Sequence, residues 1–286
     1  MKNCKVLLFN SLQVLLLCNL MKLQAKAQPL TEVTEMSSKA SIRSQVDQNL
    51  FEGQLKELVI ELGENPDRIP VDFSQKVHRW ARLYQTRDRA DMARLLGPQR
   101  RTFYRVREQF RSAELHPDLA LVALVESNFE TRALSDSGHA GLWQFEPVTA
   151  RKNGLKVGPK IDERFDPEKS TQAACRYLNT LSRTLGPHSS WLTVIAAYNL
   201  GPSRLQSRVK QLSGPQNTVD FWHLYETRTI PALTRTHIAR LVAAILVSRN
   251  ETQFGFGPTQ PSSRMAQSEQ DTPANERLQE EARLIE

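Results

Sequence analysis

Apolar residues recur every three or four positions between residues 49 and 114, and this spacing predicts a series of amphipathic helices. Turn residues interrupt the pattern at Gly63 and Pro66 and again at Gly97 and Pro98, which divides the segment into four helices. The positions predicted to face a common core are Leu55, Leu58, Val59, Leu62, Phe73, Val77, Trp80, Tyr84, Met92, Leu95, Leu96, Phe103, Val106 and Phe110. Packing alone explains these positions, and none of them requires a ligand.

The next segment, residues 118–127, is apolar on every face, which is typical of a helix buried at the centre of a domain. One carboxylate, Glu126, stands at its C-terminal end. Burial and the negative pole of the helix both disfavour the charged form, so we expect the pKa of Glu126 to be raised. A carboxyl group that stays protonated near neutral pH can serve as a general acid.

The remainder of the chain up to residue 250 also has a helical pattern. Residues 135–141 are rich in turn residues and predict a small hairpin, whereas Asp166-Pro167-Glu168 is a typical helix start with a capping residue and a proline at the first position. Helices are expected in five stretches, over residues 147–154, 167–186, 191–199, 205–212 and 238–246. No segment alternates long enough to require a sheet, so the predicted fold is mostly α.

The two ends of the chain have a different character. Residues 1–27 resemble an export signal, with lysines, an apolar run and a small-x-small triplet at Ala25-Lys26-Ala27, so we expect an exported, periplasmic or envelope-associated protein. An uncleaved anchor is disfavoured by the short, interrupted apolar run, and a lipid anchor at Cys18 is disfavoured by the leucines before it. Residues 28–48 predict a flexible lead-in, and residues 251–286 a disordered polar tail.

Composition and charge narrow the classes of function. The 286 residues, 40% of them apolar, suffice for a real core. The formal charge of +7 includes four lysines of the leader; without them 34 basic and 31 acidic side chains remain, which gives no global reason to bind nucleic acid. Leader cleavage would leave Cys175 as the sole cysteine, and the histidines are scattered, so neither a disulfide, a metal site nor a cofactor is predicted.

Four sequence blocks resemble the catalytic domain of the lytic transglycosylases, the SLT family of lysozyme-like enzymes that cleave peptidoglycan. They occur in the order of the family, with Val125-Glu126-Ser127 first, then residues 140–145 (Ala-Gly-Leu-Trp-Gln-Phe) and 196–202 (Ala-Ala-Tyr-Asn-Leu-Gly-Pro), and a weaker Thr234-Arg235 segment last. Residues 162–171 are similar to the membrane-bound D-type subfamily. The resemblance implies a lysozyme-like domain over residues 115–250, preceded by an N-terminal helical region over residues 49–114.

The resemblance also implies an activity and a substrate. Glu126 aligns with the only catalytic carboxylate of the family, which protonates the β-1,4 glycosidic oxygen between MurNAc and GlcNAc in peptidoglycan glycan strands. The N-acetyl oxygen of the substrate is thought to attack C1, and the same glutamate then acts as a base on the MurNAc 6-hydroxyl. The expected product is a 1,6-anhydro sugar, formed without water.

Further site residues follow from the same alignment. Gln144 and Asn199 supply amides suited to the N-acetyl group and to sugar hydroxyls. Tyr198 and Tyr177 align with tyrosines of the family's cleft, and Ser127 is expected to orient Glu126 or the sugar.

The sequence departs from the family pattern at three positions. Glu146 stands where the family usually has methionine, and if it faces Glu126 it would raise the pKa of Glu126 or activate water for hydrolysis. Leu233 and His237 replace the acid and the tyrosine of the usual Glu-Thr-Arg-x-Tyr segment, and His237 would make activity unusually pH-dependent if it replaces the tyrosine's hydrogen bond. Three alternatives therefore stay open: a lysozyme-type hydrolase, an inactive peptidoglycan-binding module, and a Glu126 that forms only a structural salt bridge.

Overall fold

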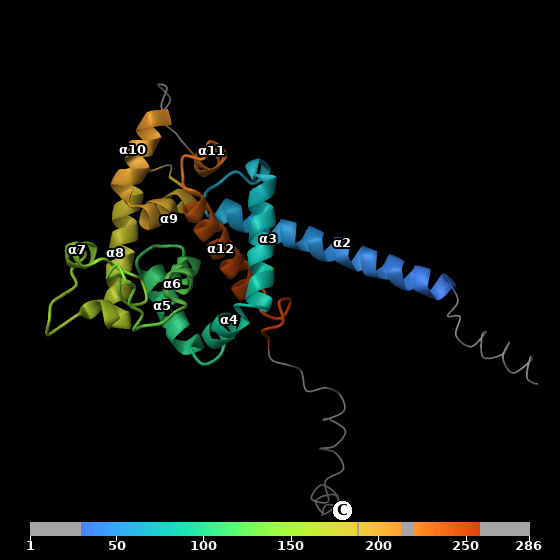
Figure 1. Ribbon diagram of the computed structural model, residues 1–286, viewed down its shortest axis with the longest axis horizontal. Coiled ribbons are helices and arrows are strands. Elements are labelled where there is room, and N and C mark those ends of the chain that lie inside the picture. The colour runs from blue at the N-terminus through green and yellow to red at the C-terminus, as the bar shows by residue number, and fades with distance from the viewer. Residues whose placement is uncertain (1–29, 188, 213–219, 258–286) are drawn as a thin grey trace, which may run out of the picture. The chain divides into compact units, whose positions relative to one another are not determined.

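A computed structural model describes residues 30–187, 189–212 and 220–257, and in these ranges the chain is mostly helical (Figure 1). The α-helices are α2 (Leu30–Glu61), α3 (Val71–Gln85), α4 (Arg89–Leu96), α5 (Arg100–Ser112), α6 (Val122–Ser127), α7 (Pro147–Lys152), α8 (Pro167–Leu185), α9 (Trp191–Leu200), α10 (Pro202–Leu212), α11 (Phe221–Glu226) and α12 (Ala232–Arg249). Short 3-10 helices span η1 (Pro66–Arg68), η2 (Pro117–Leu121) and η3 (Glu163–Phe165). The predicted mostly α class is confirmed.

The chain divides into two compact units, the first ending at Gln54 and the second beginning at Leu55. In the first unit the described residues form one continuous helix, α2, from Leu30 onward. The structure places residues 30–48 of the lead-in predicted for residues 28–48 in this helix, since the stretch has no proline or glycine to interrupt it. The predicted leader, residues 1–27, lies outside the described residues.

The core of the second unit forms around α12, which lies beside α3 (Figure 1). Ten of its residues are buried, on all sides of the helix, as expected of an element enclosed by others. The helices α9 and α6 also contact α12, and α8 contacts both α5 and α9. The part of the predicted N-terminal helical region that begins at Leu55 and the predicted domain over residues 115–250 therefore share one compact unit.

Helix α11 was not expected from the sequence. Asp220 caps it by accepting a hydrogen bond from the backbone N–H of His223 at 2.7 Å. Its aromatic side chains Phe221, Trp222 and Tyr225 pack edge-on against Phe73 of α3, with ring centroids 5.0 to 6.1 Å apart. The six-residue helix is too short for periodicity to reveal, and it is stabilised by this aromatic cluster.

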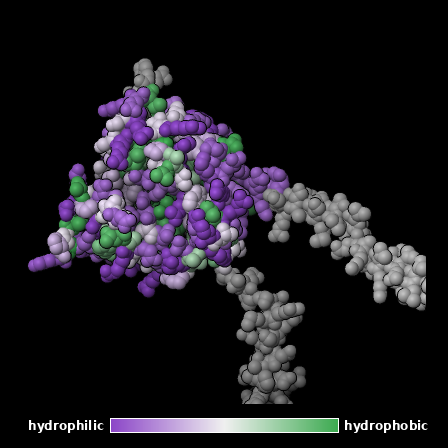
Figure 2. Space-filling view, viewed as in Figure 1, coloured by the Kyte–Doolittle hydropathy of each residue, from purple (hydrophilic) through white to green (hydrophobic). Residues whose placement is uncertain are grey.

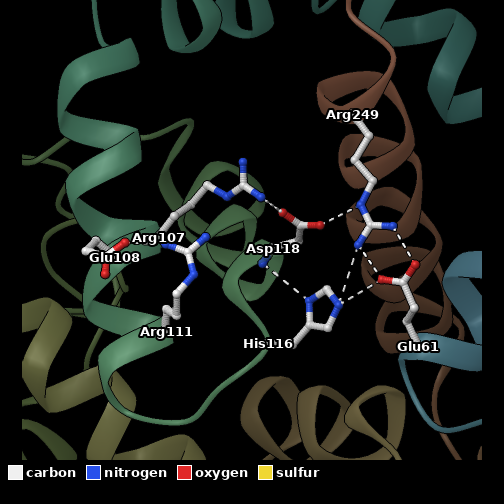
Figure 3. A network of polar contacts seen from close by, with 7 residues as sticks. All are labelled: Glu61, Arg107, Glu108, Arg111, His116, Asp118 and Arg249. Carbon is white, nitrogen blue, oxygen red and sulfur yellow. Dashed lines mark hydrogen bonds and ion pairs between the residues drawn. The ribbon is translucent and has the colours of Figure 1, made fainter.

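A network of charged side chains joins the C-terminal ends of α2 and α12 to α5 and η2 (Figure 3). Buried Asp118 forms an ion pair with Arg107 at 2.5 Å and accepts a hydrogen bond from Arg249 at 2.6 Å. Arg249 also binds both carboxylate oxygens of Glu61, at 3.0 and 2.6 Å. His116 Nδ1 accepts the backbone N–H of Asp118, so Nε2 carries the ring proton and points to Glu61 at 3.2 Å. The network fixes the start of the η2–α6 segment, which carries Glu126.

The small hairpin predicted for residues 135–141 is absent as strands among the described residues. Isolated bridges pair Ala140 with Leu134 and with Phe145 instead. The loop is held by the buried Arg164, whose guanidinium donates to the carbonyl oxygens of Gly138 at 2.7 Å and Phe145 at 2.9 Å. The loop thus keeps a few hairpin-like backbone hydrogen bonds, from Ser135 to His139 at 2.9 Å and from Gly141 to Ala133 at 2.8 Å, and the Arg164 side chain satisfies further carbonyls.

The polar tail predicted to be disordered from residue 251 begins with ordered turns. Phe254 is buried, Arg89 donates a hydrogen bond to the carbonyl of Gly255 at 2.7 Å, and Arg100 binds Glu251 at 2.6 Å. Residues 251–257 of the predicted tail are thus held by the buried Phe254, by the Phe256 ring beneath Arg89 and by two arginine contacts. Residues 258–286 lie outside the described residues.

The face seen in Figure 2 is mainly hydrophilic, with hydrophobic residues scattered among polar ones. In the ranges that the structure describes, no helix combines the length and apolar character that crossing a membrane requires.

Candidate active site

Glu126 is the second-last residue of α6, a six-residue helix whose first four residues are fully buried. The helix ends where Asn128 and Phe129 adopt left-handed conformations, with φ of 52° and 61°. Only 17% of the Glu126 side chain is exposed. Burial raises its pKa from 4.5 to about 7, against the opposing influence of the Arg240 charge, as expected from the sequence.

The charge of Arg240 lowers the pKa of Glu126, but the Arg240 side chain forms its hydrogen bonds with other residues. Its guanidinium donates to the carbonyl of Val125 at 3.3 Å and to the side chain of Asn128 at 2.9 Å, and it lies over the Trp80 ring. Within the described ranges, no arginine or lysine forms an ion pair with Glu126. The alternative in which Glu126 belongs to a structural salt bridge with an arginine is therefore not supported by the geometry.

His237 of α12 lies beside the carboxyl group instead. Its Nε2 atom is 3.4 Å from Oε1 of Glu126, and only 12% of the His237 side chain is exposed. Burial, together with the Arg240 charge, lowers the pKa of His237 from 6.5 to about 4. Between pH 4 and pH 7 both groups are consequently neutral, and the contact is not an ion pair.

A cavity of about 560 Å³ brings together five of the seven predicted site residues. Its lining comprises His139, Gln144, Phe145, Glu146, Thr149, Tyr177, Tyr198, Asn199, Leu200, Gly201, Pro202, Ser203 and Arg204. Glu126 is not part of this lining, but it lies close enough to affect it: burial of Tyr198 raises the pKa of that tyrosine, and the charge of Glu126 adds to the increase. A second cavity of about 570 Å³, between α5 and α8, is lined by none of the predicted site residues.

Two aromatic side chains form one side of the first cavity. Tyr177 of α8 and Tyr198 of α9 lie with ring centroids 5.4 Å apart, and both contact the ring of Phe145. The hydroxyl of Tyr198 donates to the carbonyl of Trp143 at 2.7 Å, which ties α9 to the loop before α7. Burial raises the pKa of both tyrosines, so both stay protonated in the neutral range.

The two predicted amide residues are each partly engaged. Gln144 has a left-handed backbone, with φ of 47°, and its amide nitrogen donates to the carbonyl of Gly141 at 3.0 Å. The amide oxygen of Asn199 accepts the hydroxyl hydrogen of Thr234 at 2.8 Å. The amide oxygen of Gln144 and the amide nitrogen of Asn199 take no part in these bonds, so the pair offers one acceptor and one donor to a ligand.

Ser127 and Trp143 are both bound up within the fold. The Ser127 hydroxyl lies 2.9 Å from the carbonyls of Ala123 and Leu142, to which it donates its one hydrogen, rather than toward Glu126. Trp143 is fully buried and stacks on Phe110 with centroids 5.3 Å apart, so it belongs to the core. Each residue is drawn inward by packing that sequence spacing does not specify.

Glu146 has 60% of its side chain exposed and lies 3.6 Å from Nε2 of His139. It lines the cavity, and its charge contributes to the raised pKa of Tyr177. The influences that set the pKa of Glu126 are burial and Arg240. Glu146 therefore lies at the solvent-exposed edge of the cavity.

Sequence reasoning missed His139, Arg240 and Arg204 as neighbours of the site. Arg240 follows His237 by three positions on α12 and so shares its face, which a helical projection of residues 232–249 would have shown. His139 lies in the irregular loop before Gln144, where no periodicity could reveal it. Across the described ranges, no three His, Cys, Asp or Glu side chains are grouped so that they could hold a metal ion.

Comparison with known proteins relates this geometry to a family. Residues 108–220 match the family model of the transglycosylase SLT domain. Over 162 residues the chain is 31% identical to the membrane-bound lytic murein transglycosylase D of Escherichia coli (strain K12), which covers 56% of this chain and 34% of that protein. The protein of the same name from Escherichia coli O6:H1 (strain CFT073) matches to the same extent. The chain spans about a third of the length of these curated relatives.

Proposed function

We propose that the protein is a peptidoglycan lytic transglycosylase that uses Glu126 as its acid and base, because residues 108–220 match the family model of the transglycosylase SLT domain. The observation that carries this proposal is a buried carboxyl group with a pKa raised to about 7 at the position of the family's catalytic glutamate. Its substrate would be the glycan strand, cut at the β-1,4 bond between MurNAc and GlcNAc. The setting would be the cell envelope, after export.

The proposed reaction begins with proton transfer from Glu126 to the glycosidic oxygen. The bond from C1 of MurNAc to that oxygen breaks, GlcNAc leaves with the new hydroxyl, and the N-acetyl oxygen of MurNAc attacks C1. Glu126, now a carboxylate, takes the proton of the MurNAc 6-hydroxyl as this oxygen attacks C1; the bond between C1 and the N-acetyl oxygen breaks, and the 1,6-anhydro ring closes. The cycle returns Glu126 to its acid form and adds no water, so a pKa near 7 suits both steps.

The residues of the cavity suit the neutral groups of this substrate. The free amide oxygen of Gln144 can accept an N–H, and the free amide nitrogen of Asn199 can donate to a carbonyl or hydroxyl. The rings of Tyr177 and Tyr198 offer apolar surface for a sugar ring. We propose these four residues as the substrate-binding group, and we assign Ser127 to the support of α6 because its hydroxyl is used within the fold.

Digestion of purified sacculi with the full chain tests the proposal. Wild type is expected to release 1,6-anhydromuropeptides, and Glu126→Gln to release none, since glutamine cannot give up a proton. Glu130→Gln, at an exposed carboxylate four positions away, is the matched control and should behave as wild type. Undiminished release by the Glu126→Gln variant would refute the assignment.

Hydrolysis of the same bond is the second candidate, and the observation in its favour is that Glu146 lines the cavity beside the tyrosines. A carboxylate there could activate water, and the products would be reducing-end sugars that are heavier by one water. Mass spectrometry of the digest separates the two reactions. Reducing-end products that disappear in Glu146→Gln would favour hydrolysis, whereas anhydro products from that variant favour the leading proposal. Sacculus binding without any product from wild type would identify an inactive binding module.

A further inference from the structure

His237 contacts Glu126 through Nε2, an imidazole nitrogen for which the described residues offer no other partner. Nε2 of His237 is fully buried and has no hydrogen-bond partner in the part of the chain that the structure describes. A buried polar atom left without a partner is costly, and most such atoms in proteins are paired. The atom within reach is Oε1 of Glu126, at 3.4 Å.

Helix α12 holds the region around Glu126 at several points. Arg240, one turn after His237, binds the carbonyl of Val125 and the side chain of Asn128, on either side of Glu126 in the sequence. Thr234, one turn before His237, binds Asn199 of the cavity. His237 lies between these anchors, so its ring is held in place against the carboxyl group. It also lies beyond residues 108–220, which match the family model.

The charged and titratable groups around His237 keep it neutral. Arg240 on its own helix opposes a second positive charge, and burial acts in the same direction. On α9 the group near Glu126 is Tyr198, which stays protonated, and on α3 Tyr84 also stays protonated, with its pKa raised to about 12. Glu126 on α6 is therefore the one acidic partner among these neighbours, and the neutral imidazole has a single N–H to offer it.

We propose that His237 is a positioning residue of the proposed transglycosylase, donating its Nε2–H to Oε1 of Glu126 in both the acid and the base stage. This inference rests on the proposed function and adds a role for a residue outside the matched domain. Oε1 can accept a hydrogen bond whether the carboxyl is protonated on Oε2 or ionised, so the bond persists as the proton leaves Oε2 and returns. The opposite tautomer would set a lone pair against the carboxylate.

The donor stabilises the carboxylate more than the acid, because hydrogen bonds to charged groups are the stronger ones. Removal of the donor should therefore raise the pKa of Glu126. His237→Phe keeps a ring of similar size and has no donor, His237→Gln keeps an amide N–H at a similar reach, and His237→Asn carries the same amide on a shorter side chain. Thr236→Val, at the neighbouring position of α12, is a control outside the site.

The test is a carboxyl titration of Glu126 by NMR, on protein labelled with ¹³C at the glutamate carboxyl groups and with Glu126→Gln used to assign the signal. We expect His237→Phe and His237→Asn to raise the midpoint by about 1 pH unit, and His237→Gln and Thr236→Val to leave it unchanged. Anhydromuropeptide release should fall about tenfold in the first two variants and recover with glutamine. Where phenylalanine prevents folding, the glutamine and asparagine pair alone decides.

The two proposals fail in different ways. Absence of anhydro products from wild type would remove the proposed function, while the titration would still report the contact between the two side chains. An unchanged midpoint in both His237→Phe and His237→Asn would overturn the positioning role even in an active enzyme. A lowered midpoint would overturn the donor assignment, since it would show that His237 favours the protonated acid.

Discussion

At the scale of single residues, the candidate site depends on Glu126, whose buried position disfavours the charged form of its carboxyl group. Burial, rather than a neighbouring carboxylate, raises the pKa of Glu126. The same burial that makes Glu126 a usable acid also makes its ionised form a cost to the folded state. The burial proposed to suit Glu126 for catalysis should therefore lower the free energy of unfolding at a pH where Glu126 is ionised.

Glu126→Gln should stabilise the protein, and more so at alkaline pH. The folded-state pKa of Glu126 is raised from 4.5 to about 7, so its contribution to stability is present below pH 4.5 and is lost as the pH rises through about 7. The full difference corresponds to about 3 kcal/mol. Denaturant unfolding at pH 5 and pH 9 measures it, with the variant gaining mainly at pH 9. A variant that is destabilised equally at both pH values would contradict the raised pKa.

If the proposed reaction holds, the activity of the wild type should decline on the alkaline side with a midpoint near pH 7, because the first step of that reaction needs the protonated form of Glu126. His237 should not add a second transition in this range, since its pKa is lowered to about 4. Initial rates of anhydro-product release between pH 5 and pH 9, at constant ionic strength, measure the profile. Rates that increase from pH 7 to pH 9 would show that the acid is not Glu126.

At the scale of elements, the loop over residues 133–146 connects the acid helix to the cavity. Isolated bridges hold the loop together, and the Arg164 guanidinium and the Ser127 hydroxyl donate hydrogen bonds to its backbone carbonyls. The closest approach is at Gly141, where φ is 77° and an added Cβ would lie 1.9 Å from the carbonyl oxygen of Arg164. The loop can pass the η3 segment only because position 141 has no side chain.

Gly141→Ala should therefore destabilise the protein by more than ~2 kcal/mol and reduce activity, since both the backbone conformation and the Cβ contact become unfavourable. Gly138→Ala is the matched control in the same loop. Its φ of 83° is equally left-handed, but nothing lies within 4 Å of an added Cβ, so only the conformational cost of about 1 kcal/mol remains. Thermal unfolding of both variants checks the difference, and equal losses would mean that the close approach to Arg164 is not maintained in solution.

At the scale of the whole molecule, the second compact unit is joined by charges as well as by its core. Glu61 near the end of α2, Asp118 of η2 and Arg249 near the end of α12 meet in one network (Figure 3). Hydrogen bonding to Arg249 is the main influence that lowers the pKa of Glu61, to about 2. The network joins residues at the ends of α2 and α12 to η2, the segment that leads into α6, so its loss should reduce the stability of the unit.

Glu61→Gln should reduce the free energy of unfolding at pH 7 by about 1 kcal/mol, a modest value because the carboxylate is partly exposed and screened. Its contribution is present above pH 4.5 and is lost as the pH falls toward 2, so wild type and variant should converge in acid. Denaturant unfolding at pH 7 and pH 3 measures both. Glu108→Gln, which breaks the exposed pair with Arg111, is the control and should change little; a loss as large as that of Glu61→Gln would show that the network adds nothing.

Local patterns in the sequence were sufficient for most helices, for the cap at Asp166 and for Glu126 as the candidate acid. Asp166 accepts the backbone N–H groups of Glu168 and Lys169, as its position before a proline predicts. Such features depend on residues within about four positions of one another, which is the range that periodicity and capping report. The same range explains why the polar composition of residues 30–48 and 251–257 did not indicate the helix of the first stretch or the buried Phe254 of the second.

The tertiary structure alone decided which partner the acid receives. The bond from Arg240 to the carbonyl of Val125 joins residues 115 positions apart, and the placement of His237 against Glu126 depends on the same packing of α12 on α6. It also turned Ser127 and Trp143 into supports of the fold, because burial requires their polar atoms to find partners wherever packing provides them. The sequence thus indicated Glu126 as the candidate acid, and the packing of α12 on α6 decided which side chains surround it.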